Sequence, residues 1–260
     1  MHALNLLRKK NLPSVAITAL NKKNLSELSL LKKELTDAGV ERWQFQMAEP
    51  MGNLSVHSVR KDLVLTPEEL PEIFDFAYDV YKEGNIIVNI ADNLGYYDTR
   101  NAEINRFSSI YKESSGIWLS CFAGKTVLGI LCNGDVVGCV SIRDRRFIED
   151  NLRKTPLREI WTRPGAFSWN RNRKIENMKG FCRKCEYGSF CLGGCTALKL
   201  TTEGDLTNNR YCLYQVEFKK KIDMQSFYLK MLGSDLQCDN SFSGGISFFS
   251  TSKFSADSNC

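Results

Sequence analysis

Seven of the ten cysteines in this 260-residue chain follow one spacing pattern, and none occurs before Cys121. Twelve residues separate Cys121 from Gly134, and four separate Gly134 from Cys139. A Cys-x2-Cys-x5-Cys-x3-Cys run and one distant cysteine complete the pattern, at Cys182, Cys185, Cys191, Cys195 and Cys212. Cytoplasmic thiols are kept reduced, so cysteines grouped in this way predict metal binding rather than disulfides.

The metal site that these cysteines predict must be rich in thiolates. The chain has only two histidines, His2 and His57, and both lie far from the cysteines. This argues against mixed His/Cys fingers and His-based hydrolytic zinc centres. A four-cysteine zinc module ordinarily has two Cys-x2-Cys pairs, whereas this chain has one. We therefore favour an iron–sulfur cluster, for which thiolates are the usual ligands.

Composition and charge narrow the class of protein. Apolar residues make up 43% of the chain and charged residues 25%, a balance typical of globular proteins. No apolar run is long enough to span a bilayer, and the first leucines precede the basic residues 8–10 instead of following them as in a secretory signal. We expect a cytoplasmic protein without a membrane partner. The segment 143–184 holds 13 Lys/Arg against 5 Asp/Glu, which predicts either a solvated basic face or a contact with an acidic peptide, nucleic acid or anionic cluster.

Residues 1–100 alternate between predicted strands and helices. We expect strands over 15–18, 43–47 and 86–91. A helix over 24–38 is expected to be capped by Asn24, and another begins at Thr66-Pro67 with a capping box. Because each helix joins two strands, this order predicts a parallel sheet with crossover helices.

Beyond residue 100 the pattern changes. Residues 101–117 lose periodicity and predict a linker. Asn133-Gly134, between β-prone runs at 127–131 and 136–142, predicts a hairpin with a type I′ turn. Helices are expected over 155–161 and 211–232, and the tail 233–260, rich in Ser, Asn and Gly, is expected to be disordered. These features divide the chain into domains at 1–100 and 118–232.

The sequence around the cysteines resembles the SPASM domain of radical SAM peptide-modifying enzymes. The resemblance covers about residues 118–215 and extends to 1–100, which resemble the second half of a radical SAM barrel. It implies an α/β fold, a partial (half) βα-barrel with parallel strands followed by a small α+β iron–sulfur domain with a β-hairpin. The motifs that carry it are Cys121-Phe122-Ala123-Gly124, Asn133-Gly134-Asp135, the segment from Pro156 to Trp161, and Cys191-Leu192-Gly193-Gly194-Cys195.

The resemblance implies two auxiliary 4Fe–4S clusters. Three cysteines would ligate the first cluster, namely Cys121, Cys139 and Cys195. Four would ligate the second, namely Cys182, Cys185, Cys191 and Cys212. Two alternatives stay open for the fourth position of the first cluster: Cys132, or an open iron position that takes a substrate group.

The same resemblance implies a further cluster, bound by a Cys-x3-Cys-x2-Cys motif, that cleaves S-adenosylmethionine. This triplet does not occur in the 260 residues. We expect the chain to use S-adenosylmethionine only when another chain or segment supplies the missing barrel half, since the strand at 15–18 is otherwise an unpaired apolar edge. Polar residues at strand ends, Thr18, Asn21, Gln44 and Gln46, are candidates to line the cofactor pocket, because sites in parallel sheets lie at the carboxyl ends of strands. The alternative for Asn21 is that it only shapes a turn.

The leading hypothesis is the carboxyl-terminal part of a radical SAM/SPASM maturase that acts on a peptide or protein. Its auxiliary clusters would move electrons or hold substrate. The first alternative is a non-catalytic iron–sulfur module that transfers electrons or recruits a substrate for another enzyme. The second is a zinc module that binds nucleic acid through residues 143–184, although that stretch has no base-stacking or finger pattern. No residue is assigned a catalytic role.

Overall fold

The computed structural model describes residues 1–108 and 118–235, with side chains described as far as residue 229. The chain divides into two compact units, Met1–Lys219 and the residues from Lys220 onward. Among the described residues, no helix is both long enough and apolar enough to cross a membrane.

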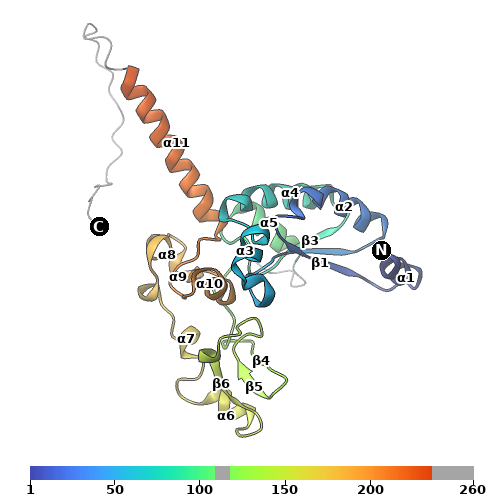
Figure 1. Ribbon diagram of the computed structural model, residues 1–260, viewed down its shortest axis with the longest axis vertical. Helices are drawn as coiled ribbons and strands as arrows, with labels where there is room; N and C mark the ends of the chain where they lie inside the picture. The colour runs from blue at the N-terminus through green and yellow to red at the C-terminus, as the bar shows by residue number, and fades with distance from the viewer. Residues whose placement is uncertain (109–117, 236–260) are drawn as a thin grey trace. The chain divides into compact units, whose positions relative to one another are not determined.

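The first unit begins with a three-stranded parallel sheet (Figure 1). Its strands, in the order β1-β2-β3, are β1 (Val15–Leu20), β2 (Arg42–Met47) and β3 (Ile87–Ile90). The crossovers carry α2 (Leu28–Asp37) and α4 (Leu70–Glu83). Alternate residues of β2 are buried against the hydrophobic core, namely Trp43, Phe45 and Met47. The predicted parallel α/β arrangement is confirmed.

Several short elements in this region escaped prediction. They are α1 (His2–Lys9), η2 (Gly52–Ser55) and α3 (His57–Leu63). The two predicted helices each begin with a 3-10 turn, η1 (Leu25–Glu27) and η3 (Pro67–Glu69). The capping box at Thr66 forms as expected, because Glu69 accepts a hydrogen bond from the Thr66 N–H at 2.5 Å. The predicted cap at Asn24 was wrong. Its Oδ1 accepts a hydrogen bond from the Asn21 N–H at 2.9 Å, so the side chain closes a turn instead.

The predicted linker was also wrong for residues 101–108, which belong to helix α5 (Thr99–Ser108). This helix contacts β3 and α4. Its buried face includes Asn101 and Ser108 beside Ile104. A helix that buries polar side chains leaves little apolar periodicity in the sequence, and periodicity is the main signal for a helix. Residues 109–117 lie outside the described residues.

The cysteine-rich region contains a small antiparallel sheet, β4-β5-β6. Its strands are β4 (Gly129–Ile130), β5 (Asp135–Val137) and β6 (Ile148–Asn151), the last of which was not predicted. The hairpin is confirmed but the turn type was wrong. Gly134 has a φ of 91°, whereas Asn133 is not among the described non-glycine residues with positive φ. The N–H of Leu131 donates to Asp135 O at 2.9 Å, which defines a three-residue loop.

Helical turns connect this sheet to the rest of the domain. They are η4 (Arg145–Phe147), α6 (Leu157–Thr162), α7 (Ser168–Arg171), η5 (Ile175–Asn177), α8 (Gly180–Lys184), α9 (Gly188–Cys191) and α10 (Thr196–Glu203). The long helix α11 (Leu213–Asp235) begins in the first unit and continues into the second. The prediction of a helix over 211–232 is thus confirmed to within a turn. Residues 236–260 of the predicted tail lie outside the described residues.

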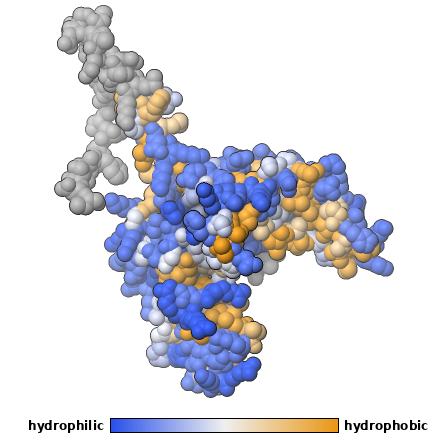
Figure 2. Space-filling view, viewed as in Figure 1, coloured by the Kyte–Doolittle hydropathy of each residue, from blue (hydrophilic) through white to orange (hydrophobic). Residues whose placement is uncertain are grey.

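Strand β1 is an edge of its sheet and exposes apolar side chains. Val15 is 57% exposed and Ile17 is 62% exposed. Figure 2 shows hydrophobic surface over the region of β1 and α1. An uncovered apolar edge strand invites pairing with another segment or chain.

Candidate metal centre

Four of the seven patterned cysteines line one cavity. They are Cys182, Cys185, Cys191 and Cys212. Cys182 lies on α8 and Cys191 ends α9, while Cys185 follows α8 and Cys212 directly precedes α11. Short helices separated by tight turns therefore bring together sulfurs that span 31 positions of the sequence. This is the same set of four that the sequence assigns to one cluster.

Glycines allow the backbone to close around this cavity. A Cβ on Gly188 would lie 2.5 Å from the carbonyl oxygen of Cys182, so only glycine permits α8 and α9 to approach so closely. After Cys191 the chain turns through Leu192, Gly193 and Gly194, all with positive φ. This turn directs Cys195 away from the cavity that Cys191 lines, and Cys195 is not among its lining residues.

Of the cysteines that line the cavity, Cys182 and Cys191 are buried and Cys185 and Cys212 are half-buried, and backbone groups hydrogen-bond to the thiols. Burial raises the pKa of Cys191 to about 12, while a backbone hydrogen bond from Gly194 opposes that rise. Burial also raises the pKa of Cys182, Cys185 and Cys212, again opposed by backbone hydrogen bonds. Buried thiols held by backbone N–H groups suit a thiolate-bound cluster, whose properties depend on hydrogen bonds to the sulfurs. The donor set therefore fits an iron–sulfur group.

The other three patterned cysteines are Cys121, Cys139 and Cys195, and two of them pack against one buried cluster. Cys139 and Cys195 pack against the same buried residues, Ile142, Phe147 and Ala197. Burial raises the pKa of Cys195 to about 12, with Glu49 and Cys121 as further causes. Backbone hydrogen bonds from Leu198 and Ala197 oppose this rise. Cys195 thus shares its buried surroundings with Cys139, and Cys121 is one of the groups that raise its pKa.

Cys132 lies in the hairpin loop and is exposed. The structure therefore leaves its thiol in contact with solvent, whereas Cys121 is buried and Cys139 is half-buried.

Within the described residues, no group of three or more His, Cys, Asp or Glu side chains is placed to hold a single metal ion. A 4Fe–4S cubane does not require its ligands to converge on one point. A single zinc ion draws each sulfur to about 2.3 Å from one point. A 4Fe–4S cluster offers each of four cysteines its own iron, so its ligands lie further apart.

A buried tyrosine fastens Cys195 to the parallel sheet. The Tyr96 hydroxyl accepts a hydrogen bond from the Cys195 N–H at 2.9 Å and donates one to the carbonyl of Asp92 at 2.8 Å. Tyr96 is 1% exposed and its ring contacts the place where a Cβ on Gly194 would lie. Asp92 follows β3, so this single side chain joins the carboxyl end of the sheet to the cysteine loop.

Two buried cations lie among the cysteines. Lys199 is 0% exposed and its Nζ donates to the carbonyl of Leu192 at 2.7 Å. Burial lowers the pKa of Lys199 to about 7, and Arg173 lowers it further, while Cys191, Cys121 and Cys182 oppose the shift. Arg173 donates to Thr196 Oγ1 at 3.1 Å. Neither cation forms an ion pair with a carboxylate of the described residues.

The residues predicted to line a cofactor pocket at the strand ends do not share one surface. Thr18 faces the helix-covered side of the sheet, where its Oγ1 accepts a hydrogen bond from Trp43 Nε1 at 2.8 Å. Gln44 and Gln46 alternate with the buried residues of β2 and so lie on the opposite face. Asn21 donates to the carbonyl of Ala19 at 3.0 Å, which is the turn-shaping role named as its alternative. Thr18 and Gln46 therefore cannot contact one ligand on the open face of the sheet.

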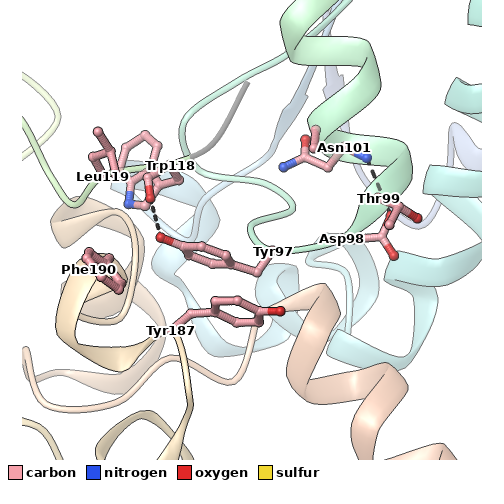
Figure 3. Close-up of a pocket in the computed structure, with 9 residues that line it drawn as sticks. Tyr97, Asp98, Thr99, Asn101, Trp118, Leu119, Tyr187 and Phe190 are labelled. Atoms are coloured by element: carbon pink, nitrogen blue, oxygen red, sulfur yellow. Dashed lines mark hydrogen bonds between the residues drawn. The ribbon is translucent and has the colours of Figure 1, made fainter. Parts of the chain in front are cut away.

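An aromatic pocket of about 430 Å³ adjoins the cysteine cavity (Figure 3). Tyr97 lines both. The rings of Tyr97 and Tyr187 stack with centroids 4.3 Å apart, and the Tyr97 hydroxyl donates to the carbonyl of Trp118. The buried indole Nε1 of Trp118 has no partner among the described residues. The other lining residues are Asp98, Thr99, Asn101, Ala102, Leu119 and Phe190.

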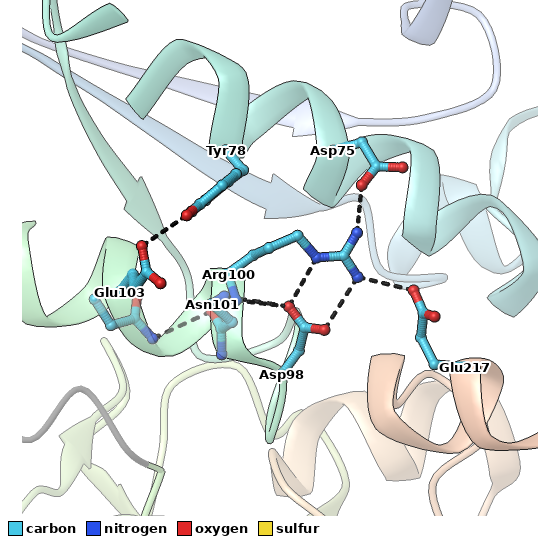
Figure 4. Close-up of polar contacts among 8 residues, drawn as sticks. Asp75, Tyr78, Asp98, Arg100, Asn101, Glu103 and Glu217 are labelled. Atoms are coloured by element: carbon cyan, nitrogen blue, oxygen red, sulfur yellow. Dashed lines mark hydrogen bonds and ion pairs between the residues drawn. The ribbon is translucent and has the colours of Figure 1, made fainter. Parts of the chain in front are cut away.

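Arg100 holds the wall of this pocket in place (Figure 4). Its guanidinium pairs with Asp98 at 2.9 Å, with Glu217 of α11 at 2.8 Å, and with Asp75 of α4. These hydrogen bonds, with that to Asp98 as the largest cause, raise the pKa of Arg100 above its ordinary value. One cation thereby joins α4, α5 and the start of α11 around the Asp98–Asn101 segment.

Residues 121–186 match the family model of SPASM, described as an iron–sulfur cluster-binding domain. The chain carries a SPASM domain. The AdoMet-dependent heme synthase of Methanosarcina barkeri is 25% identical to the chain over 217 residues, which are 82% of this chain and 59% of that protein. This chain therefore spans about three fifths of the curated relative that it matches.

Solved structures share the fold of the SPASM domain and of the parallel sheet together. SuiB of Streptococcus suis has a TM-score of 0.55 and 14% identity, over 81% of this chain and 48% of SuiB. Native anSMEcpe with bound AdoMet has a TM-score of 0.56 and 16% identity, over 86% of this chain and 59% of that chain. Both proteins have also been solved with a peptide, SuiB with the precursor peptide SuiA and anSMEcpe with the Cp18Cys peptide. The predicted resemblance to radical SAM/SPASM maturases is confirmed.

Sequence reasoning missed the residues that surround the cysteines of the SPASM domain. Tyr96 and Tyr97 follow the last predicted strand of the first domain and Trp118 directly follows the predicted linker, and none of the three was a candidate site residue. A signal for Lys199 was present, since it is the one charged residue in the run Thr196–Thr202 of a helix with a buried face. A lone lysine on such a face indicates either a buried charge or a solvent-exposed head group, and only the fold distinguishes them.

The buried thiols of the SPASM domain are expected to resist alkylation even when they carry no metal. Only the thiolate reacts, and raising the pKa of Cys191 from 9.0 to about 12 reduces its thiolate fraction roughly a thousandfold at neutral pH. In chelator-treated, reduced protein, iodoacetamide should therefore label Cys132 long before Cys191 or Cys212, as measured by peptide mass spectrometry. Equal labelling rates in the folded protein would contradict the burial described here.

Replacing Arg100 by Met should destabilise the first unit by about 2 kcal/mol, because three carboxylates lose a partly buried partner. The measurement is the urea midpoint of the Arg100→Met variant against the parent chain. Arg146→Met is the matched control, since Arg146 pairs with Asp144 but its side chain is 72% exposed, so its midpoint should hardly move. Similar shifts for both variants would contradict the role given to Arg100.

Proposed function

We propose that this chain is the carboxyl-terminal portion of a radical SAM/SPASM enzyme that modifies a peptide or protein. Its seven patterned cysteines hold two auxiliary 4Fe–4S clusters. Cys121, Cys139 and Cys195 bind the first, and the second is bound by Cys182, Cys185, Cys191 and Cys212. The observation that carries the proposal is the single cavity shared by the last four, inside a region that matches an iron–sulfur domain.

The chain's own residues would exclude water from these sites and stabilise the ligating sulfurs. The aromatic rings of Tyr96, Tyr97 and Tyr214 line the cavity and reduce the access of water. Backbone hydrogen bonds to the sulfurs stabilise their thiolate form. When bound, the clusters would supply one-electron transfer or, at an open iron position, a contact for a substrate group.

The aromatic pocket beside the cavity supports a peptide substrate. Its lining is mostly apolar, and Asp98, Thr99 and Asn101 add polar groups, a combination suited to a peptide. Relatives of the same fold bind peptides, namely SuiB with SuiA and anSMEcpe with Cp18Cys. Cleavage of S-adenosylmethionine would require the barrel half that bears the Cys-x3-Cys-x2-Cys motif, and the exposed residues of β1 offer an edge on which that half, in a separate chain or a further segment, would pair.

Anaerobically purified protein is expected to be brown and to contain about eight irons per chain, four for each cubane. The Cys182→Ala variant should retain about four. The Cys195→Ala variant should also retain about four irons, but it should lose the first cluster and keep the second, although Cys195 follows Cys191 by only four positions. The measurement is iron and sulfide content together with the electron paramagnetic resonance spectrum of the reduced protein. Stoichiometric zinc without iron would overturn the proposal.

Cys132→Ser serves as the control in the same series. Because Cys132 is exposed, we expect the variant to keep all of its iron, which would favour an open position on the first cluster. Loss of the first cluster in this variant would instead assign Cys132 as its fourth ligand.

A heme-related substrate is the second candidate, because the curated relative from Methanosarcina barkeri is a heme synthase. The two candidates differ in how hemin should behave. If the substrate is a peptide, titrating hemin into the iron-loaded protein should give no saturable change in its visible absorption. A saturable change that is lost in a Tyr97→Ala variant would favour the second candidate, since Tyr97 lines the pocket beside the cysteine cavity.

A further inference from the structure

Lys199 occupies a position that no other charged side chain of the described cysteine region shares. Its backbone N–H donates to the carbonyl of Cys195, of the first cysteine set, at 3.2 Å. Cys121 of that set and Cys191 and Cys182 of the other all act on its pKa. The side chain is fully buried in α10, and its Nζ approaches the turn after Cys191 through the carbonyl of Leu192. A Cβ on Gly193 would lie 3.1 Å from Nζ, so the glycine leaves room for the ammonium group.

This buried charge has no carboxylate partner. Lys199 and Arg173 are both buried, and neither is ion-paired with Asp or Glu in the described part of the chain. A buried cation is costly unless a negative group compensates it. The negative groups within range of Lys199 are cysteine sulfurs, which carry charge when they ligate metal. A cubane bound by thiolates is anionic, so it would compensate Lys199 where the protein does not.

We propose that Lys199 is a positioning residue whose buried positive charge is shared by the two cysteine sets and raises the reduction potentials of both clusters. The inference rests on the proposed function, since it requires iron at both sets. Arg173 assists on one side only, because Cys121 is the one cysteine on which its charge acts. A positive charge near a cluster favours the electron that the cluster gains on reduction, and low dielectric strengthens the effect. One charge between two centres therefore shifts both potentials in the same direction.

The test is a redox titration of the iron-loaded full chain, followed by electron paramagnetic resonance. Each cluster takes one electron from the added low-potential reductant, and no bond in the protein is made or broken. In Lys199→Met, which keeps the length of the side chain but removes its charge, both clusters should become harder to reduce by at least tenfold, which is about 59 mV for a one-electron couple. Lys199→Arg, which keeps the charge, should restore values near those of the parent.

Lys184→Met is the matched control. It removes the same charge from a residue beside Cys185, but Lys184 is exposed, so solvent screens it and the potentials should change far less. Unchanged potentials in Lys199→Met, or a shift of one cluster only, would overturn the inference.

Iron content separates the remaining outcomes. Loss of iron in Lys199→Met with retention in Lys199→Arg would also support the role of the charge, whereas loss in both would show that only packing matters and would overturn it. Absence of iron from the parent chain would instead refute the proposed function itself.

Discussion

The hydroxyl of Tyr96 is a buried contact that joins the parallel sheet to the cysteine loop within the first unit. It accepts the N–H of Cys195 and donates to Asp92 at the end of β3. Because the hydroxyl is buried, losing either partner would leave a polar group unsatisfied in a low-dielectric interior. The carboxyl end of the sheet, where ligands of parallel α/β folds bind, is thus held at a set distance from the turn that redirects Cys195. The loop after β3 therefore belongs to the metal centre as much as the cysteines do.

A second consequence of burial concerns electrostatics. Lys199, Arg173 and three of the patterned cysteines are buried, and desolvation is the largest cause of the pKa shifts of Cys191, Cys195 and Lys199. Burial disfavours the charged form of each group when it stands alone. Deprotonated sulfurs and protonated cations attract one another and so offset the cost of burying each charge. The region is therefore stabilised when both kinds of charge are present together. An anionic iron–sulfur group is the partner that such a set of residues is suited to hold.

The pocket beside the cysteine cavity depends on long-range contacts of a different kind. Arg100 draws carboxylates from α4, from the turn before α5 and from α11 around one guanidinium. Tyr97 and Tyr187, 90 positions apart in the sequence, stack at 4.3 Å. Neither arrangement has a local sequence signal, because each joins segments that are adjacent only in the folded chain. The error at α5 has a related origin, since that helix buries Asn101 and Ser108 and so lacks the apolar stripe that identifies a helix.

The sequence alone determined the parallel βαβ order, the hairpin and the identity of the cysteine pattern. These features arise from local rules, namely periodicity, turn chemistry and the spacing of thiolates, that operate over a few residues. Tertiary structure alone decided that Thr18 turns toward Trp43 rather than an open pocket, that Cys132 faces solvent, and that Lys199 is fully buried beside the turn that follows Cys191. The direction in which a strand residue points and the burial of a charged side chain depend on which distant segments pack over them. The local sequence pattern does not contain that information.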